Sequence, residues 1–179
     1  MNILTQSSMT DGQPSQIVYE DQVHGSILIS TEDWDIIQTK EFQRLKNIKQ
    51  LGGAFLVFPT ATHSRYEHCI GTLQVAGDLI ENLKNNQEGR LEVEERDKRN
   101  VMTAALCHDL GHGPFSHTFD NNFIQVRFPE LKWCHERCSV ELFEFMIDNN
   151  HIDHFEREDI RMIQDFIIGA QKNSKQHLW

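Results

Sequence analysis

The sequence lacks the features of a membrane or secreted protein. Its unbroken apolar runs are short, and AFLVF at residues 54–58 is among the longest, far below the roughly 20 residues of a membrane-spanning helix. The polar start, MNILTQSSMTDGQPSQ, has no apolar core for a signal peptide, and the four cysteines have no disulfide-framework spacing. We therefore expect an intracellular protein of the nucleus or cytoplasm, with no membrane association.

Positive charge is also scarce, with 17 Lys and Arg against 27 Asp and Glu and a formal net charge of −10. Non-specific nucleic-acid binding needs a broad basic face. Bulk nucleic-acid binding is therefore not indicated, although a local basic pocket for phosphate stays open. The hydrophobic share of 39% over 179 residues suits one globular domain or a piece of a larger one.

The patterns along the chain predict a mainly α fold with a small β element near the start. Residues 1–16 are dominated by Ser, Thr, Gln, Asp, Gly and Pro, which predicts a disordered segment. The stretch IVYEDQVHGSILIS at residues 17–30 predicts two short strands joined through His24 and Gly25.

Apolar residues at helical spacing predict five helices after this hairpin. The first begins near Thr31 and ends at Gly52. The second begins at Ser64, which forms a capping pair with Glu67, and runs past Leu83. Three more are expected: one through Leu106 that stops at the glycines, one over residues 135–149 and one over residues 157–168.

The densest chemistry lies in LCHDLGHGPFSH at residues 106–117, where three histidines and an aspartate surround a Gly-Pro break. A helix that ends here carries His108 and Asp109 on its last turn, and the glycines then fold the chain back. Imidazole nitrogen and carboxylate oxygen together suit borderline divalent metals. The pair is therefore predicted to be half of a metal site, and His68 is the best further ligand.

Two other metal motifs are weaker. HDLGH at residues 108–112 could be a variant of the H-E-x-x-H zinc motif, but that motif needs an uninterrupted helix, which the glycines oppose. A structural zinc site from Cys134, His135 and Cys138 lacks a second ligand pair at zinc-finger spacing. Arg65 stands at a helix N-terminus beside free backbone N–H groups, which suits phosphate binding.

His68 followed by the pair His108 and Asp109 resembles the HD-domain metal-dependent phosphohydrolases. The longer stretches FQRLKNIKQLGG, VFPTATHSRYEH and LCHDLGHGPFSH are similar to one family among them, the deoxynucleoside triphosphate triphosphohydrolases that join a sterile alpha motif to an HD domain. The resemblance runs from about residue 17 to 169. It implies the HD-domain helical fold, with residues 17–179 as the N-terminal part of the family's domain.

The resemblance also implies roles for the site residues. His68, His108 and Asp109 would bind a divalent metal ion, which could be Fe, Mn, Mg or Zn. Arg65 and His112 would contact the substrate phosphates. Cationic groups in these positions spread the negative charge that develops on a phosphoryl group during transfer.

Further roles implied by the resemblance concern proton transfer and the sugar. His117 would be the general acid that protonates the leaving 5′ oxygen, since histidine titrates near neutral pH. Asp120 would orient it, and His135 would line the same pocket. Gln50 and Leu51 would face the deoxyribose and help to reject a 2′-hydroxyl group.

Two departures from the family change what we expect of this chain. The family's fourth metal ligand, an Asp, lies downstream of the position of Trp179 and has no counterpart here, and the sterile alpha motif is absent. We therefore expect impaired turnover and partial metal occupancy, and a homo-oligomer only in a full-length form. Positions of the guanine-nucleotide activator site read Gln38, Glu20 and Lys46, which predicts weak or altered activation.

The expected activity is metal-dependent hydrolysis of deoxynucleoside triphosphates to deoxynucleoside and triphosphate, and two alternatives stay open. A truncated HD module could bind nucleotides or protein partners without turnover, and the missing Asp favours this alternative. A different nucleotide phosphodiester could be the substrate, but the FQRLKNIKQLGG block disfavours it, because that block resembles one family and not HD enzymes in general.

Overall fold

The computed structural model describes residues 16–87 and 92–169. Within them lie seven α-helices and a two-stranded antiparallel sheet, which confirms a mainly α fold with a small β-hairpin at the start. The disorder expected for the N-terminal segment lies outside the described residues. No helix in the described ranges is long and apolar enough to span a bilayer.

The hairpin forms where the sequence pattern predicted it. Strand β1 (Gln16–Asp21) pairs with β2 (Gly25–Ser30). The turn is closed by the Asp21 carboxylate, which accepts the backbone N–H groups of Val23 and His24 at 2.8 and 2.9 Å. Alternate residues of β2 point into the core, because the side-chain period of a strand is two.

The single helix predicted from Thr31 to the glycines is wrong. The chain instead forms α1 (Thr31–Gln38) and α2 (Lys40–Gln43), followed by short 3-10 turns. Thr39 leaves helical geometry at ψ 153°; its hydroxyl donates to the Ile36 carbonyl and accepts the Phe42 N–H. One residue therefore ends a helix and caps the next, while the buried side chains keep their helical spacing.

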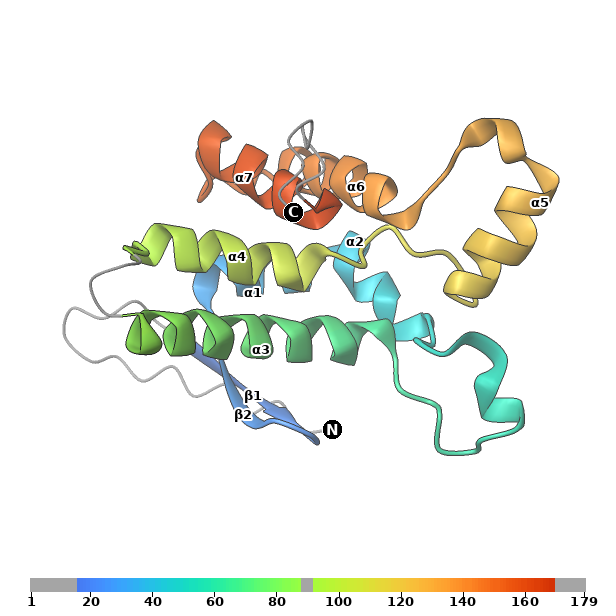
Figure 1. Cartoon of the computed structure of the whole chain (residues 1–179), viewed down its shortest axis with the longest axis horizontal. Coiled ribbons are helices and arrows are strands. Elements are labelled where there is room, and N and C mark those ends of the chain that lie inside the picture. The colour runs from blue at the N-terminus through green and yellow to red at the C-terminus, as the bar shows by residue number, and fades with distance from the viewer. Residues whose placement is uncertain (1–15, 88–91, 170–179) are drawn as a thin grey trace.

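Two consecutive helices, of 22 and 13 residues, lie side by side and run antiparallel (Figure 1). Helix α3 (Arg65–Asn86) begins with the predicted capping box, in which Ser64 and Glu67 bond each other's backbone N–H groups. Helix α4 (Glu95–Cys107) ends just before His108 and Asp109, which the sequence analysis placed on its last turn; His108 is instead its C-cap. Antiparallel packing brings the first turn of α3 against the last turn of α4, at the end of the molecule where the polar cluster lies.

Helices α6 (His135–Asn149) and α7 (Arg157–Ile168) cover the predicted ranges and lie on the other side of α4 from α3 (Figure 1). An ion network ties α7 to α4. The Asp159 carboxylate accepts Arg96 Nε at 2.6 Å and the Asn100 side-chain N–H at 2.7 Å. Although burial opposes it, these donors lower the pKa of Asp159 to about 2.

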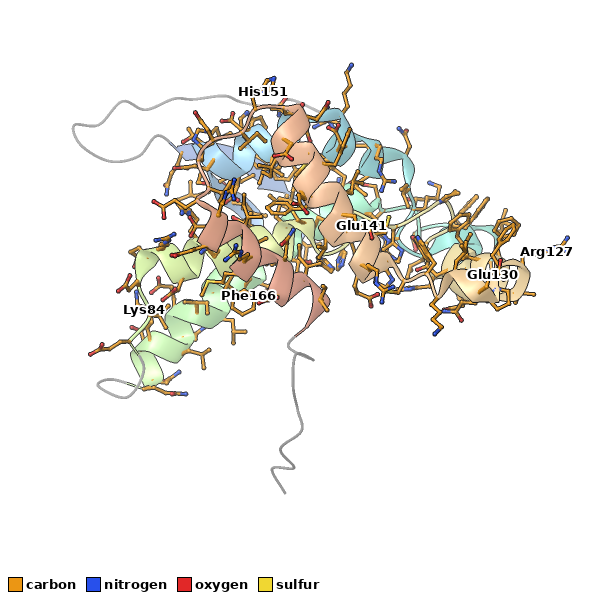
Figure 2. All side chains as sticks on the ribbon, turned by 90° about the horizontal axis from the view of Figure 1, so that it is seen from above. Lys84, Arg127, Glu130, Glu141, His151 and Phe166 are labelled. Atoms are coloured by element: carbon orange, nitrogen blue, oxygen red, sulfur yellow. The ribbon has the colours of Figure 1, made fainter. Side chains whose placement is uncertain are left out.

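An irregular projection joins α4 to α6, and the sequence pattern predicted no helix in it. It contains η3 (Phe119–Ile124), a π-helical turn, then α5 (Gln125–Arg127) and η4 (Pro129–Leu131). Arg127 and Glu130 lie at its far end, opposite Lys84 (Figure 2). Its aromatic side chains pack on one another: the ring centroids of Phe119 and Phe123 are 5.5 Å apart.

Candidate metal centre and adjoining acid–base cluster

The meeting of α3 and α4 brings together His68, His108 and Asp109, which we call the first cluster. The Nε2 atoms of His68 and His108 are 3.3 Å apart, and each lies 3.2 Å from Asp109 Oδ2. Donors about 2.1 Å from one ion lie roughly 3.0 Å apart in octahedral and 3.4 Å apart in tetrahedral geometry. The donor set and its spacing therefore fit a divalent metal ion.

The orientation of His108 also suits a ligand. Its Nδ1 lies 2.7 Å from the Ala105 carbonyl oxygen. Because a carbonyl can only accept, Nδ1 carries a proton, and Nε2, which faces Asp109, is the nitrogen that is available to a metal ion. Although burial acts the other way, the Asp109 carboxylate raises the pKa of His108 above its usual range.

Asp109 carries the negative charge of the first cluster. It is buried, and Arg65 Nη1 donates to its Oδ2. Burial raises the pKa of Asp109, but hydrogen bonding by His108, His112 and His68 outweighs it and holds that pKa well below its usual range. The carboxylate is therefore ionised throughout the neutral range, as a metal ligand must be.

Three residues that the sequence reasoning missed fix the turn after α4. Arg44 donates to the carbonyl oxygens of Leu110 and His112, the latter at 2.9 Å. The Ser139 hydroxyl donates to the His108 carbonyl at 2.7 Å and accepts a backbone N–H from the same turn. The Ser116 hydroxyl accepts Arg65 Nε at 2.9 Å. Sequence signals existed for two of them, because Arg44 lies in the FQRLKNIKQLGG block and Ser116 in the LCHDLGHGPFSH block.

A glycine is required where α6 approaches this turn. A Cβ atom at Gly111 would lie 2.4 Å from the His135 carbonyl oxygen and 2.4 Å from the Ser139 nitrogen. Helix α4 stops at Cys107, so His108 and His112 do not share a helix. This excludes the H-E-x-x-H alternative, and it shows that the helix ends in the turn before Gly111 and not at the glycines themselves.

The second cluster consists of His112, His117, Asp120 and His135. The Nδ1 atoms of His135, His112 and His117 lie 3.1, 3.3 and 3.7 Å from Asp120 Oδ2. The rings of His112 and His135 stack, with centroids 3.9 Å apart. The four residues that were assigned to catalysis from the resemblance are therefore side by side.

His112 connects the two clusters. It is fully buried, with Nε2 3.3 Å from Asp109 Oδ1 and Nδ1 facing Asp120. Burial and the nearby Arg65 charge lower the pKa of His112. His117 differs, because 60% of its side chain is exposed. The buried ring can fix the two carboxylates, and the exposed ring can exchange protons with solvent or substrate.

Of the two residues assigned to the sugar, Gln50 lines a pocket of about 530 Å³ beside His68. Its backbone N–H bonds the His63 carbonyl at 3.1 Å. Leu51 is half exposed on the loop that follows. Neither of the two clusters found within residues 16–87 and 92–169 contains a cysteine. His135 therefore lies with Asp120, and it does not form a zinc site with Cys134 and Cys138.

Comparisons with known proteins agree with this geometry. Residues 65–172 match the HD domain family. The chain is 44% identical over 170 residues to deoxynucleoside triphosphate triphosphohydrolase SAMHD1 of Homo sapiens, covering 90% of this chain and 27% of that protein. It is 41% identical over 181 residues to the SAMHD1 protein of Danio rerio, with 97% and 29% covered, and 39% identical over 158 residues to the Dictyostelium discoideum SAMHD1 homolog, with 88% and 30% covered.

The chain spans between a quarter and a third of the length of these relatives. The HD domain match covers more than half of the chain and includes both clusters, from His68 to His135. The resemblance read from the sequence is thereby confirmed, and this chain belongs to the HD domain family.

Proposed function

We propose that this chain is a metal-dependent phosphohydrolase that converts deoxynucleoside triphosphates to deoxynucleoside and triphosphate. The observation that carries the proposal is the juxtaposition of the two clusters, a metal-binding triangle and an acid–base group, joined through His112. The relatives named as deoxynucleoside triphosphate triphosphohydrolases support the substrate class.

The first cluster would hold the metal ion. A divalent ion supplies Lewis acidity toward phosphoryl oxygens. The two imidazoles and one carboxylate of His68, His108 and Asp109 suit Fe, Mn or Zn, and Mg less well because it prefers oxygen donors. Among the described residues this cluster contains only three donors, so we propose partial occupancy and impaired turnover.

Arg65 would contact a substrate phosphate through Nη2, the guanidinium nitrogen with the weakest hydrogen bond within the protein. Its Nη1 and Nε bond Asp109 and Ser116. Its Nη2 makes a long 3.5 Å contact with the Gln50 carbonyl, which a phosphate oxygen can replace at a better distance. A phosphate contact by His112 requires that its buried ring turn outward, so we give it a second role, holding the carboxylates of both clusters.

His117 would be the general acid. Its exposed ring can reach a substrate in the open part of the site, and its Nδ1 lies 3.7 Å from Asp120 Oδ2. A carboxylate on one ring nitrogen orients the imidazole and leaves the other nitrogen for the leaving 5′ oxygen. His135, stacked on His112, would keep the second cluster in this arrangement.

Gln50 and Leu51 would face the deoxyribose, since Gln50 borders the pocket beside His68. For the activator, Lys46 Nζ lies 4.5 Å above the Tyr66 ring, and Gln38 ends α1. An amide at Gln38 cannot pair with guanine as a carboxylate does. We therefore propose weak or altered guanine-nucleotide activation, and a homo-oligomer in a full-length form in which residues 17–179 are the N-terminal part of the domain.

The experiment is a product assay with each of the four deoxynucleoside triphosphates in the presence of Mn²⁺. We expect slow release of deoxynucleoside and tripolyphosphate, lost in His108→Gln and retained in His154→Gln, a matched exposed histidine that bonds Asp35. Saturable nucleotide binding without any product would favour the alternative, a module that binds nucleotides or protein partners. Equal turnover by His108→Gln would contradict the role of the first cluster.

A further inference from the structure

Two consecutive residues just before His117 have a backbone conformation that side chains disfavour. Phe115 and Ser116 have φ values of 63° and 54°, in the left-handed region that favours glycine. Within residues 16–87 and 92–169, no other two neighbouring residues except glycines share this feature. Such strain persists only where the surrounding structure holds it, and it gathers at functional sites. The turn that contains this pair is therefore a candidate for a role in the site.

The packing of Phe115 does not account for this conformation, because its side chain is 62% exposed. The Ser116 N–H bonds the Gly113 carbonyl at 3.1 Å, so residues 113–116 form a β-turn with Pro114 second and Phe115 third. A positive φ at the third position, after a proline, is that of a type II turn, where glycine is the usual residue. Burial of the Phe115 ring does not offset the strain, so other contacts must hold the turn.

Ser116 supplies these contacts. Its side chain is buried, and its hydroxyl accepts Arg65 Nε at 2.9 Å and donates to the Lys49 carbonyl at 2.8 Å. The hydroxyl therefore bonds the turn both to the start of α3 and to the loop before it. In the same loop, a Cβ atom at Gly52 would lie 2.7 Å from the Phe115 carbonyl oxygen, so the two backbones are in close contact. The turn is held on two sides.

The strained turn sets the start of the segment that bears the second cluster. His117 follows Ser116 directly, and the Ser116 carbonyl accepts the Phe119 N–H at 2.9 Å, one residue before Asp120. The His117 ring lies edge-on to the His112 ring, with centroids 4.7 Å apart, and its Nδ1 is 3.7 Å from Asp120 Oδ2. Because 60% of the His117 side chain is exposed, packing alone does not fix this ring. Its position depends on the backbone of the turn.

We propose that Ser116 is a positioning residue, whose hydroxyl holds the strained turn and thereby keeps the His117 ring beside Asp120. The same hydroxyl bonds Arg65, which donates to Asp109 of the first cluster, so Ser116 couples the positions of the two clusters. The effect on turnover rests on the proposed function, in which His117 is the general acid. The position of the ring does not rest on it and is measured without turnover.

The first measurement is the nuclear magnetic resonance spectrum of the histidine rings in the whole chain. The neighbouring His112 ring displaces the His117 ring signals, and in Ser116→Ala these signals should move to those of a freely exposed histidine. Ser116→Gly should give the same shift, and it folds more readily because glycine suits a positive φ. Ser139→Ala, which removes another buried hydroxyl from the turn after α4, should leave the His117 signals in place. Unchanged His117 signals in both Ser116 variants would overturn the proposal.

The second measurement is turnover, which separates positioning from general support. Ser116→Ala should lower the rate by about 10–100-fold, the effect of a small misplacement. In a His117→Gln background it should lower the rate by less than about 2-fold, because the group that it positions is already lost. A loss that adds in full in this background would overturn the proposal. If the unsubstituted chain has no turnover, the proposed function fails, and the histidine spectrum still decides whether Ser116 holds His117.

Discussion

The first and second clusters lie side by side and are connected by His112, a member of the second, yet they stand on different kinds of backbone. The first cluster stands where two long helices meet, and its three donor atoms form an even triangle of 3.2–3.3 Å. The second stands on an irregular turn and a π-helical segment, with distances to one oxygen that spread from 3.1 to 3.7 Å. Regular helices fix one geometry, and the irregular segment allows several.

The two clusters also differ in how many hydrogen bonds hold their carboxylates. Asp109 is held by Arg65, and the adjoining backbone by Arg44 and Ser139. Asp120 has no hydrogen bond from a described residue to either carboxylate oxygen. The side chains of the first cluster are therefore held in place before a ligand binds, as a metal site needs. In the second cluster, a bound ligand would supply the hydrogen bonds that Asp120 lacks.

The largest effect is expected at the centre of the rigid cluster. Asp109→Ala should abolish metal binding there and lower stability by about 3 kcal/mol, because it leaves the buried Arg65 charge without its partner. His108→Gln should lose the metal with little change in stability, since 31% of its side chain is exposed. Elemental analysis and thermal unfolding measure both; full metal occupancy in either variant would rule out the first cluster as the metal site.

A smaller effect, confined to turnover, is expected in the adaptable cluster. His117→Gln should lower the rate by about 100-fold or more, as for the loss of a general acid, while the metal content of the first cluster is unchanged. Rates with a substrate that has a good leaving group should recover, because such a group needs no proton. An unchanged rate with the ordinary substrate would remove the acid role.

A substitution at Arg44 should weaken the bonds that hold the turn after α4, and with it the geometry of the first cluster. Arg44→Lys keeps the charge but cannot bond two carbonyl oxygens in a fixed fork. We expect metal affinity to fall by about 10-fold, the effect of a lost outer-shell contact. Arg127→Lys, on the exposed projection (Figure 2), is the matched control. Equal metal affinity in the two variants would show that the turn holds its shape without Arg44.

The smallest effects concern two buried carboxylates outside both clusters, Asp33 and Asp159. Their pKa values are shifted in opposite directions. Burial raises the pKa of Asp33 to about 6, above the unfolded value of about 3.9. Its stabilising contribution is therefore complete below about pH 4 and is lost as the pH rises through 6, on the order of 2 kcal/mol. The pKa of Asp159 is about 2, so its contribution is present above about pH 4 and lost as the pH falls toward 2.

Chemical unfolding between pH 2 and 7 measures both carboxylates. Asp33→Asn should remove the decline in stability between pH 4 and 6. Asp159→Asn should remove the acid loss, with an effect on the order of 1 kcal/mol because solvent screens the partly exposed Arg96. Metal content should be unaffected in both variants. A change in metal binding would mean that stability and the first cluster are not independent.

Helices with ordinary boundaries could be predicted from the sequence, and those broken by a single side chain could not. Helices α6 and α7 match the predicted ranges because apolar spacing and acidic first turns agree there. The break at Thr39 depends on one hydroxyl that bonds in both directions. The projection at Phe119–Ile124 escaped prediction because its aromatic residues pack on one another and not on a helical stripe.

The candidate site was predictable to a similar degree. A metal pair at the end of a helix followed from the residues, and the remaining roles came from the family resemblance. Arg44 and Ser116 were missed because their partners are 51 to 68 residues away, a distance over which a sequence pattern carries no signal. The lack of hydrogen bonds to the Asp120 carboxylate could not be predicted from the sequence either, because it depends on the path of the π-helical turn.

The most direct test of the central claim follows the oxygen atom of water. The metal-loaded chain is incubated with a deoxynucleoside triphosphate in water labelled with a heavy oxygen isotope, and the products are weighed by mass spectrometry. Attack at the α-phosphorus with protonation of the 5′ oxygen predicts label in the tripolyphosphate, unlabelled deoxynucleoside, and neither product with Asp109→Ala. Label in a deoxynucleoside monophosphate, or no cleavage by the metal-loaded chain, would contradict it.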